Sequence, residues 1–256
     1  MSQGTFAAPR RAVTVIDAGV GNLGNLVRAF AHLGAAPAVT REPREVAAAR
    51  CLVLPGVGAF APPREALRGP LEEALRAALA DGAWLLGICV GYQLLFAQSE
   101  EFQVTDGLGL LSGRVTRLPA GVPVPHIGWN RLHDLADHPL LAGLAAGEPA
   151  EPEPAAAAAA ASAPPSAGAA AAGGSESAAG ERPRGGRYLY FVHSYAPEGV
   201  ADGECLALAT HGRRFAAVAG QGRVLGTQFH PERSGAPGLR LLANFLEMAH
   251  GPAAGD

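Results

Sequence analysis

The sequence of 256 residues contains no lysine, and all 20 of its basic residues are arginine. With 23 acidic residues the formal net charge is −3, and no basic block offers the electrostatic footprint of a nucleic-acid or membrane-surface partner. No uninterrupted apolar run approaches the roughly 18 residues of a membrane span, and residues 1–11 lack the apolar stretch of a secretion signal. We therefore expect a cytoplasmic protein with no nucleic-acid and no membrane partner.

Cysteine is scarce, with only Cys51, Cys89 and Cys205 in the chain. An odd number of cysteines without metal-type or redox-type spacing argues against a disulfide framework. Cys51 and Cys205 stand within or beside apolar residues, as buried structural thiols usually do. Cys89 has different neighbours and is analysed separately below.

One long segment lacks nearly every residue that builds a core. Residues 147–187 are almost wholly Ala, Gly, Pro, Ser and Glu, so they cannot bury enough apolar surface to offset their chain entropy. We interpret them as a surface insertion that the chemistry does not need. The sequence thus predicts a flexible extension (1–11), a single domain (12–250) that the insertion interrupts, and a tail (251–256).

Short β-rich runs alternate with helical periodicity in the first part of the chain. We predict strands at 12–17, 36–40, 51–54 and 84–88, and helices at 23–33, 63–80 (one or two helices) and 90–98. The second half is richer in strands, at 188–195, 204–210, 214–219 and 224–229, before a closing helix at 238–249. The pattern predicts an α/β fold with a mostly parallel central sheet flanked by helices, and with additional antiparallel strands in its second half.

Cys89 lies in Gly87-Ile-Cys89-Val-Gly91, where an apolar strand is expected to turn into a helix. Glycines two residues before and after a nucleophile permit the sharp turn that projects it above a sheet. A helix starting at Val90 would also direct its positive dipole end at the sulfur and favour the reactive thiolate. Cys89 is therefore the candidate nucleophile.

A thiol nucleophile needs an imidazole base and a group that orients it. In His230-Pro231-Glu232 the proline favours extended backbone, so the side chains at positions 230 and 232 point the same way. The segment follows a predicted strand, as Cys89 does, and ligands of open α/β sheets bind at the carboxyl ends of strands. The alternative histidines, none with a carboxylate at such a constrained offset, are His126, His133, His138 and His193.

The first three of these alternatives are spaced His-x6-His-x4-His, which is not a helical or hairpin metal-binding spacing, so we expect no metal site.

Attack on a carbonyl requires hydrogen-bond donors for the oxyanion that forms. The N–H of Val90 is one candidate. The loop Pro55-Gly56-Val57-Gly58, directly after a predicted strand, can supply a second, or can be an ordinary strand-to-helix connection.

Gly19-Val-Gly21-Asn-Leu-Gly24 matches the G-x-G-x-x-G pattern of dinucleotide-binding loops, and Glu42 lies past the second predicted strand. The match is weak in a chain with 34 glycines, and Glu42 sits in what looks like a loop. Dinucleotide binding stays open as an alternative, beside a tight turn that packs a helix on the sheet.

Together these stretches resemble the class I (triad) glutamine amidotransferases, and within that family the amidotransferase subunits of imidazole glycerol phosphate synthase, which serve histidine biosynthesis. The resemblance covers about residues 13–249 apart from the insertion, and it implies a flavodoxin-like fold. The stretches that carry it are Gly21-Asn-Leu, Leu54-Pro-Gly-Val-Gly-Ala-Phe60, Leu86-Gly-Ile-Cys-Val-Gly-Tyr-Gln-Leu-Leu-Phe96, Gly107-Leu-Gly-Leu-Leu111, Val124-Pro-His-Ile-Gly-Trp-Asn130, Tyr190-Phe-Val-His-Ser-Tyr195 and Gln228-Phe-His-Pro-Glu232.

The resemblance implies a role for each matching residue. Cys89 would form a glutamyl thioester, His230 would shuttle the proton and Glu232 would orient the imidazole. The N–H groups of Val57 and Val90 would bind the oxyanion. The residues that would hold glutamine are Gly56, Gln93, Ser194 and Tyr195.

The resemblance also implies a partner, a separate cyclase subunit with a (β/α)₈ barrel that forms a heterodimer with this chain and receives the ammonia. Tyr190 and Arg233 lie where the family contacts it. Arg233 replaces the usual lysine, and the insertion precedes the Tyr190 strand. No cofactor is implied. A stand-alone cysteine hydrolase or γ-glutamyl peptidase with the same triad remains the main alternative.

Overall fold

A computed structural model describes residues 11–251 except 20, 22 and 146–185. The predicted extension (1–11), insertion (147–187) and tail (251–256) lie outside the described residues, apart from Arg11, Gly186, Arg187 and Gly251 at their edges. Gly186, which follows the undescribed segment, forms a β-bridge with Ala145, which precedes it. The two residues that flank the undescribed segment are thus adjacent in the structure, as expected for an insertion.

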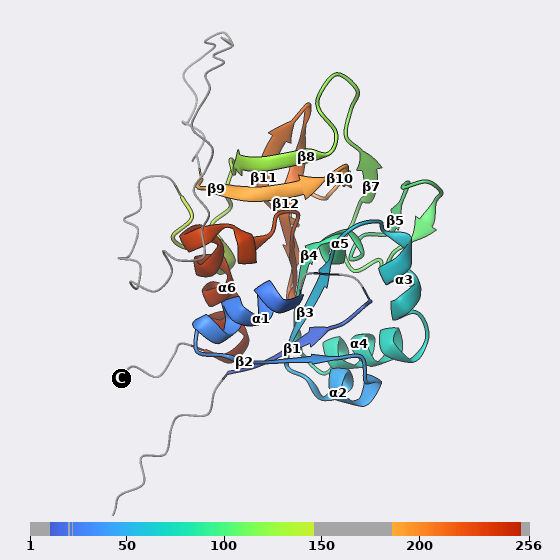
Figure 1. Ribbon diagram of the computed structural model, residues 1–256, viewed down its shortest axis with the longest axis vertical. Coiled ribbons are helices and arrows are strands. Elements are labelled where there is room, and N and C mark those ends of the chain that lie inside the picture. The colour runs from blue at the N-terminus through green and yellow to red at the C-terminus, as the bar shows by residue number, and fades with distance from the viewer. Residues whose placement is uncertain (1–10, 20, 22, 146–185, 252–256) are drawn as a thin grey trace, which may run out of the picture.

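The core is a seven-stranded sheet in the order β11-β12-β13-β4-β3-β1-β2 (Figure 1). Five strands run parallel: β1 (Ala12–Ile16), β2 (Ala36–Thr40), β3 (Cys51–Gly56), β4 (Trp84–Cys89) and β13 (Val224–Thr227). Two antiparallel strands complete one edge: β11 (Cys205–His211) and β12 (Arg213–Gln221). This arrangement confirms the predicted fold class.

Helices cover both faces of the sheet (Figure 1). One face packs against α1 (Leu23–His32) and α6 (Gly235–His250), and the other against α2 (Pro43–Ala48), α3 (Ala61–Leu67) and α4 (Pro70–Ala80). Side chains of β3 alternate between these layers, since Val53 joins the first core and Leu52 and Leu54 join the second. Burial on both faces explains the continuous apolar run of β3.

Residues 98–131 and 188–198 add two smaller sheets. One has the order β10-β7-β5-β6, and the other is the antiparallel ribbon β8-β9. Their bounds are β5 (Gln98–Ser99), β6 (Thr105–Asp106), β7 (Arg114–Arg117), β8 (His126–Arg131), β9 (Tyr188–His193) and β10 (Tyr195–Glu198). The sequence pattern predicted neither β7 nor β8, nor the short helix α2.

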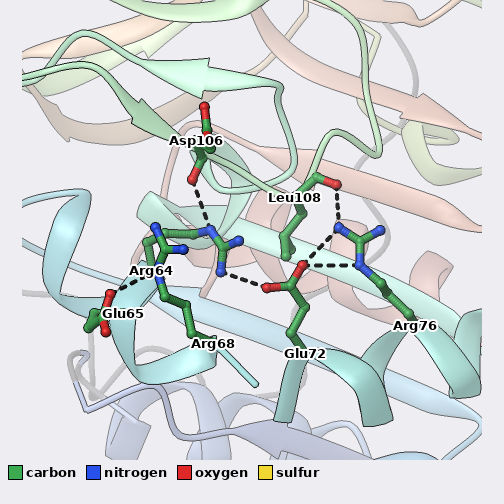
Figure 2. Close-up of polar contacts among 7 residues, drawn as sticks. All are labelled: Arg64, Glu65, Arg68, Glu72, Arg76, Asp106 and Leu108. Atoms are coloured by element: carbon green, nitrogen blue, oxygen red, sulfur yellow. Dashed lines mark hydrogen bonds and ion pairs between the residues drawn. The ribbon is translucent and has the colours of Figure 1, made fainter. Parts of the chain in front are cut away.

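A buried arginine ties the segment after β6 to the helical layer (Figure 2). Arg64 of α3 is 5% exposed, donates to the Asp106 carbonyl (2.9 Å) and pairs with Glu72 of α4 (2.7 Å). Arg76 pairs with the same carboxylate (2.9 Å) and donates to the Leu108 carbonyl (2.7 Å). Burial disfavours the charged form of Glu72, but the two arginines outweigh it and hold the pKa of this carboxyl below its usual range.

The predicted helix at 90–98 is wrong. Helix α5 spans only Val90–Gln93, and Gln98 already belongs to β5. The carbonyls of residues 94, 95 and 96 accept hydrogen bonds from backbone N–H groups within residues 108–111, so they are not used to continue a helix. A partner distant in sequence, which local periodicity does not reveal, ends this helix early.

The single predicted strand at 188–195 is two strands that pair in different sheets. His193 ends β9 opposite His126 of β8, whereas Tyr195 begins β10 opposite Arg117 of β7. The chain changes sheets at Ser194, and this change brings β9 and β10 to the edge where β4 ends.

Glycines let the turn after β4 approach the neighbouring strand. A Cβ on Gly91 would lie 1.8 Å from the Leu54 carbonyl oxygen, and a Cβ on Gly87 would lie 2.8 Å from the Gly91 carbonyl oxygen. Both contacts involve backbone, which cannot move without shifting a strand.

We expect Gly91→Ala to destabilise the protein by about 3 kcal/mol or more, since the added methyl overlaps β3. Gly203→Ala is the matched control, because a Cβ there meets nothing within 4 Å. Urea unfolding monitored by circular dichroism measures both. Equal stability of the two variants would contradict the packing described here.

Candidate functional site

Cys89 is the last residue of β4 and adopts a left-handed backbone conformation, with φ 54° and ψ −110°. Positive φ is strained for a residue with a side chain and is typical of a nucleophile elbow. The side chain is 3% exposed. In the parallel pairing of β3 and β4 it lies beside Gly56, so the two strands end at the same level.

His230 follows β13 and is held by its backbone. Its N–H donates to the Tyr190 carbonyl of β9 (2.9 Å), and its carbonyl accepts from the Ser234 hydroxyl (2.6 Å). The same hydroxyl accepts from the Tyr190 N–H (2.9 Å). Ser234, which the sequence analysis did not single out, therefore locks the histidine to β9.

Glu232 orients the imidazole. Nδ1 of His230 lies 2.8 Å from Oε1 of Glu232, and both side chains are almost fully buried. Burial alone lowers the pKa of His230, but the adjacent Cys89 sulfur and the Glu232 carboxylate raise it, to about 10. The imidazolium form is thus favoured at neutral pH, and Nε2 is the nitrogen left for the sulfur.

The two other thiols occupy different environments. Burial raises the pKa of the Cys51 thiol to about 12 and also raises the pKa of the Cys205 thiol. Cys205 is only partly buried, which corrects the expectation of a fully buried side chain. Neither residue lines the cavity described next, so both are poor nucleophiles.

A cavity of about 350 Å³ opens over the thiol. It collects residues from segments far apart in the chain: Val57, Gly58, Cys89, Val90, Gln93, Glu101, Pro125, Val192, His193, Ser194, Tyr195, His230, Glu232 and Arg233. The structure therefore brings together nine of the eleven residues predicted for the site.

Gly56 and Tyr190 are the two predicted residues that do not line this cavity. Gly56 packs beneath it, where a Cβ would lie 2.8 Å from the Gly91 nitrogen. Tyr190 lies at the rim, and the guanidinium of Arg233 sits 4.3 Å from the centre of its ring. The position of Gly56 suits close backbone packing, and the position of Tyr190 suits contacts at the cavity rim.

Glu101 is a cavity residue that sequence reasoning missed. It accepts a hydrogen bond from the Phe60 N–H (2.6 Å), and burial raises the pKa of its carboxyl more than that bond lowers it. It stands in a polar, charged stretch without a motif, so no local signal marks it. Its carboxylate adds a negative charge at the cavity end that Val57 and Gly58 also line.

Gln228 was also missed as a site residue, whereas His193, which the sequence offered as an alternative base, lines the cavity. Gln228 is 0% exposed, and its Nε2 lies 3.9 Å from the Cys89 sulfur. It stands two residues before His230, but the chain bends at residues 228 and 229, so the spacing alone does not identify it.

His193 and His126 form a neutral hydrogen-bonded pair. Nδ1 of His193 lies 2.8 Å from the Tyr195 carbonyl, which can only accept, so this nitrogen carries the hydrogen. Nε2 of His193 must then accept from Nδ1 of His126 (2.9 Å), and Nε2 of His126 is left to accept from Asn130 (3.3 Å).

Desolvation keeps both rings uncharged. Burial, with a smaller contribution from His211, lowers the pKa of His126 to about 4. Burial also lowers the pKa of His193 to about 3, in spite of its bond to the Tyr195 carbonyl. The tautomers are fixed over the neutral pH range.

Comparison with known proteins identifies the family of the chain. The model of the family "Glutamine amidotransferase class-I" matches residues 14–151. This match covers more than half of the chain, so the chain belongs to the class I glutamine amidotransferases.

Curated relatives narrow the assignment. Imidazole glycerol phosphate synthase subunit HisH of Symbiobacterium thermophilum is 41% identical over 92% of this chain and 93% of its own length. The same subunit of Methanosarcina mazei is 37% identical over 92% of this chain and 98% of its own. Within its class the chain belongs to this HisH family, which confirms the predicted glutamine amidotransferase activity and favours it over dinucleotide binding.

Solved structures agree at the level of the fold. A crystal structure of a glutamine amidotransferase aligns with a TM-score of 0.63 at 21% identity, over 93% of this chain and 98% of the other. The structure of PurLQS from Thermotoga maritima aligns with a TM-score of 0.62 at 18% identity, over 94% of this chain and 99% of the other.

Among the described residues, no helix is long and apolar enough to cross a membrane.

The neutral His193 makes stability depend on pH. Because its pKa is lowered to about 3 in the folded protein, the unfolded chain binds one more proton between that value and about 6.5. Its contribution is complete above about pH 6.5 and is lost as the pH falls. His230, whose pKa is raised, is protonated in both states below pH 6 and adds no slope there.

We therefore expect His193→Asn to flatten the dependence of the free energy of unfolding on pH between about 5 and 6, by about 1.4 kcal/mol per pH unit. Urea unfolding at several pH values measures this slope. The exposed His32 provides the control His32→Asn, which should keep the wild-type slope. An unchanged slope in His193→Asn would show that the ring is not held neutral.

Proposed function

We propose that Cys89, His230 and Glu232 are the catalytic triad with which this chain hydrolyses glutamine to glutamate and ammonia. The observation that carries the proposal is the contact of 2.8 Å between His230 and Glu232, made in the same cavity as a cysteine with strained backbone. Nucleophile, base and orienting carboxylate are the three parts that thiol-based amide hydrolysis requires.

The chemistry follows from the two protonation states of His230. The Cys89 sulfur attacks the side-chain amide carbon of glutamine, and the proton it has given up resides on Nε2 of His230. That proton passes to the leaving nitrogen as the C–N bond breaks, which releases ammonia and leaves a glutamyl thioester. Neutral His230 then takes a proton from water, which attacks the thioester and releases glutamate. Glu232 stabilises the imidazolium in both steps.

The other cavity residues suit binding of glutamine. Backbone N–H groups of Val57 and Val90 are the proposed oxyanion donors, and each directly follows one of two strands that end side by side. The carboxylate of Glu101 offers a partner for the ammonium of an amino acid. The remaining proposed substrate-binding residues are Gly56, Gln93, Ser194 and Tyr195.

The ribbon β8-β9 offers a docking face for the cyclase subunit. In its antiparallel register, Trp129 lies opposite Tyr190 and Arg131 lies opposite Tyr188, so these four side chains share one face. Trp129 is 47% and Tyr188 58% exposed, large values for aromatic side chains. The opposite face of the ribbon packs on the core through Phe191.

We further propose that the partner is a (β/α)₈ cyclase and that the ammonia reaches it without meeting bulk water, where it would be protonated. Tyr190 and the adjacent Arg233 link the docking face to the cavity rim, since Arg233 also lines the cavity. The three free thiols suit a reducing compartment, so we place the enzyme in the cytoplasm. Residues 12–250 form its single domain, interrupted by the insertion.

We expect Cys89→Ala to reduce glutaminase activity at least about 1000-fold, and Glu232→Gln about 100-fold or more. The measurement is glutamate release with and without a purified cyclase subunit and its nucleotide-like substrate. Cys205→Ser, which alters a thiol outside the cavity, should stay within about twofold of wild type.

Two results would count against this proposal. Glutamine hydrolysis retained by Cys89→Ala would exclude the triad. Partner-independent hydrolysis of γ-glutamyl peptides by the wild type would instead favour a stand-alone peptidase.

We expect Trp129→Ala and Arg233→Ala each to raise the Kd for the cyclase subunit at least about tenfold, since large aromatic and arginine side chains dominate the energy of interfaces. Titration calorimetry with the purified subunits measures this. Val39→Ala removes an exposed apolar side chain from β2, at the far edge of the central sheet, and should leave the Kd unchanged. Equal effects of all three substitutions would exclude the β8-β9 face.

A further inference from the structure

A continuous chain of hydrogen bonds begins at the nucleophile and ends on the β8-β9 ribbon. Its first member is Gln228, which directly follows β13, is fully buried and does not line the cavity. Its Nε2 lies 3.9 Å from the Cys89 sulfur, which also lies 3.8 Å from the Val192 carbonyl. Gln228 thus contacts the thiol without lining the cavity, whereas Val192 does line it.

The orientation of the Gln228 amide is determined by its neighbours. Gln93 contacts both the Tyr195 carbonyl (2.9 Å) and the Gln228 amide (3.1 Å) through one atom. The carbonyl can only accept, so that atom is the Gln93 nitrogen, and the Gln228 atom that accepts from it is oxygen. The Gln228 nitrogen is therefore the atom that faces the sulfur, and it presents an N–H.

The Tyr195 carbonyl is itself held from the other side. His193 donates to it from Nδ1 at 2.8 Å, and His126 donates to His193 at 2.9 Å. Both rings are neutral in the neutral pH range, and the Tyr195 carbonyl, which can only accept, fixes their donor and acceptor roles. The chain from His126 to Gln228 thus has one arrangement, in which His193 and Gln93 both donate to the Tyr195 carbonyl.

We propose that Gln228 is a positioning residue for the Cys89 sulfur, and that the Tyr195 carbonyl with the His193–His126 pair fixes its amide. An N–H donor aimed at sulfur stabilises the thiolate more than the thiol, because hydrogen bonds to ions are stronger than those between neutral groups. The inference rests on the proposed role of Cys89 as the nucleophile. It adds a donor that acts before glutamine binds.

The proposal predicts different effects of a Gln228 substitution on kcat and on KM. Gln228 contacts the nucleophile but does not line the cavity, and Gln93 keeps its bond to the Tyr195 carbonyl when Gln228 is lost, so the main effect falls on the fraction of reactive thiolate. We expect Gln228→Met to lower kcat at least about tenfold with KM within about twofold of wild type. Methionine has a similar length and no N–H.

The direct test needs no substrate. The rate of alkylation of Cys89 by iodoacetamide is measured against pH, with the modified peptide identified by mass spectrometry. Ionisable groups from several elements face the thiol and stay in place in the variant: His230, Glu232 and Arg233 after β13, His193 on β9, and Glu101 after β5. A shift of the alkylation midpoint therefore reports the loss of the amide.

We expect the midpoint of alkylation to move upward by about one pH unit in Gln228→Met, a tenfold loss of thiolate at a given pH. Gln93→Met, which frees the Gln228 amide, should shift it in the same direction by about half as much. Gln221→Met, at an exposed glutamine at the end of β12, should not shift it. Circular dichroism and urea unfolding show which variants fold.

A midpoint within about 0.2 pH units of wild type in a folded Gln228→Met protein overturns the inference. If Gln228→Met does not fold, an alkylation midpoint of a folded Gln93→Met protein within the same limit overturns the inference. These results are independent of the proposed function, because alkylation reports the thiol whether or not it hydrolyses glutamine. Glutaminase activity retained by Cys89→Ala would contradict the proposed catalytic triad. The alkylation result would then still describe the reactivity of the Cys89 thiol.

Discussion

The carboxyl ends of β3, β4 and β13 meet at one edge of the sheet, and the whole site depends on that adjacency. The three strands are parallel neighbours, so the residues that follow them emerge together. Glycine at position 91 allows the turn after β4 to approach β3 within a distance that no side chain would permit. The chain thereby places a cysteine, the loop that contains Val57 and Gly58, and a histidine around one cavity.

Electrostatics divides the histidines of the site into two groups. His230 sits between a sulfur and a carboxylate and is favoured as a cation, whereas His193 and His126 are buried without a carboxylate partner and remain neutral. The charged ring suits proton transfer. The neutral rings suit a fixed hydrogen-bond arrangement, which ends on the carbonyl that anchors Gln93.

The sequence was informative where a constraint is local. The alternation of apolar runs predicted the parallel core, and the elbow glycines marked Cys89, whereas the resemblance to the family supplied Gln93, Ser194, Tyr195 and Arg233. The prediction that His230 and Glu232 lie side by side is confirmed, but the extended backbone expected there is wrong, because Pro231–Arg233 form a 3₁₀ helix. Sequence reasoning failed where partners are distant in sequence. The early end of α5 depends on N–H groups in residues 108–111, the division of the strand at 188–195 depends on β8 and β7, and Glu101 enters the cavity from a loop without any motif.

The central claim, that the sulfur of Cys89 carries the glutamyl group, can be tested by acid quenching during turnover of glutamine, followed by proteolysis and mass spectrometry. The account predicts a glutamyl thioester on the peptide that contains Cys89, and none on the peptides that contain Cys51 or Cys205. Hydrolysis of glutamine with no adduct on Cys89 under conditions that preserve thioesters, or an adduct on either of the other cysteines, would contradict it.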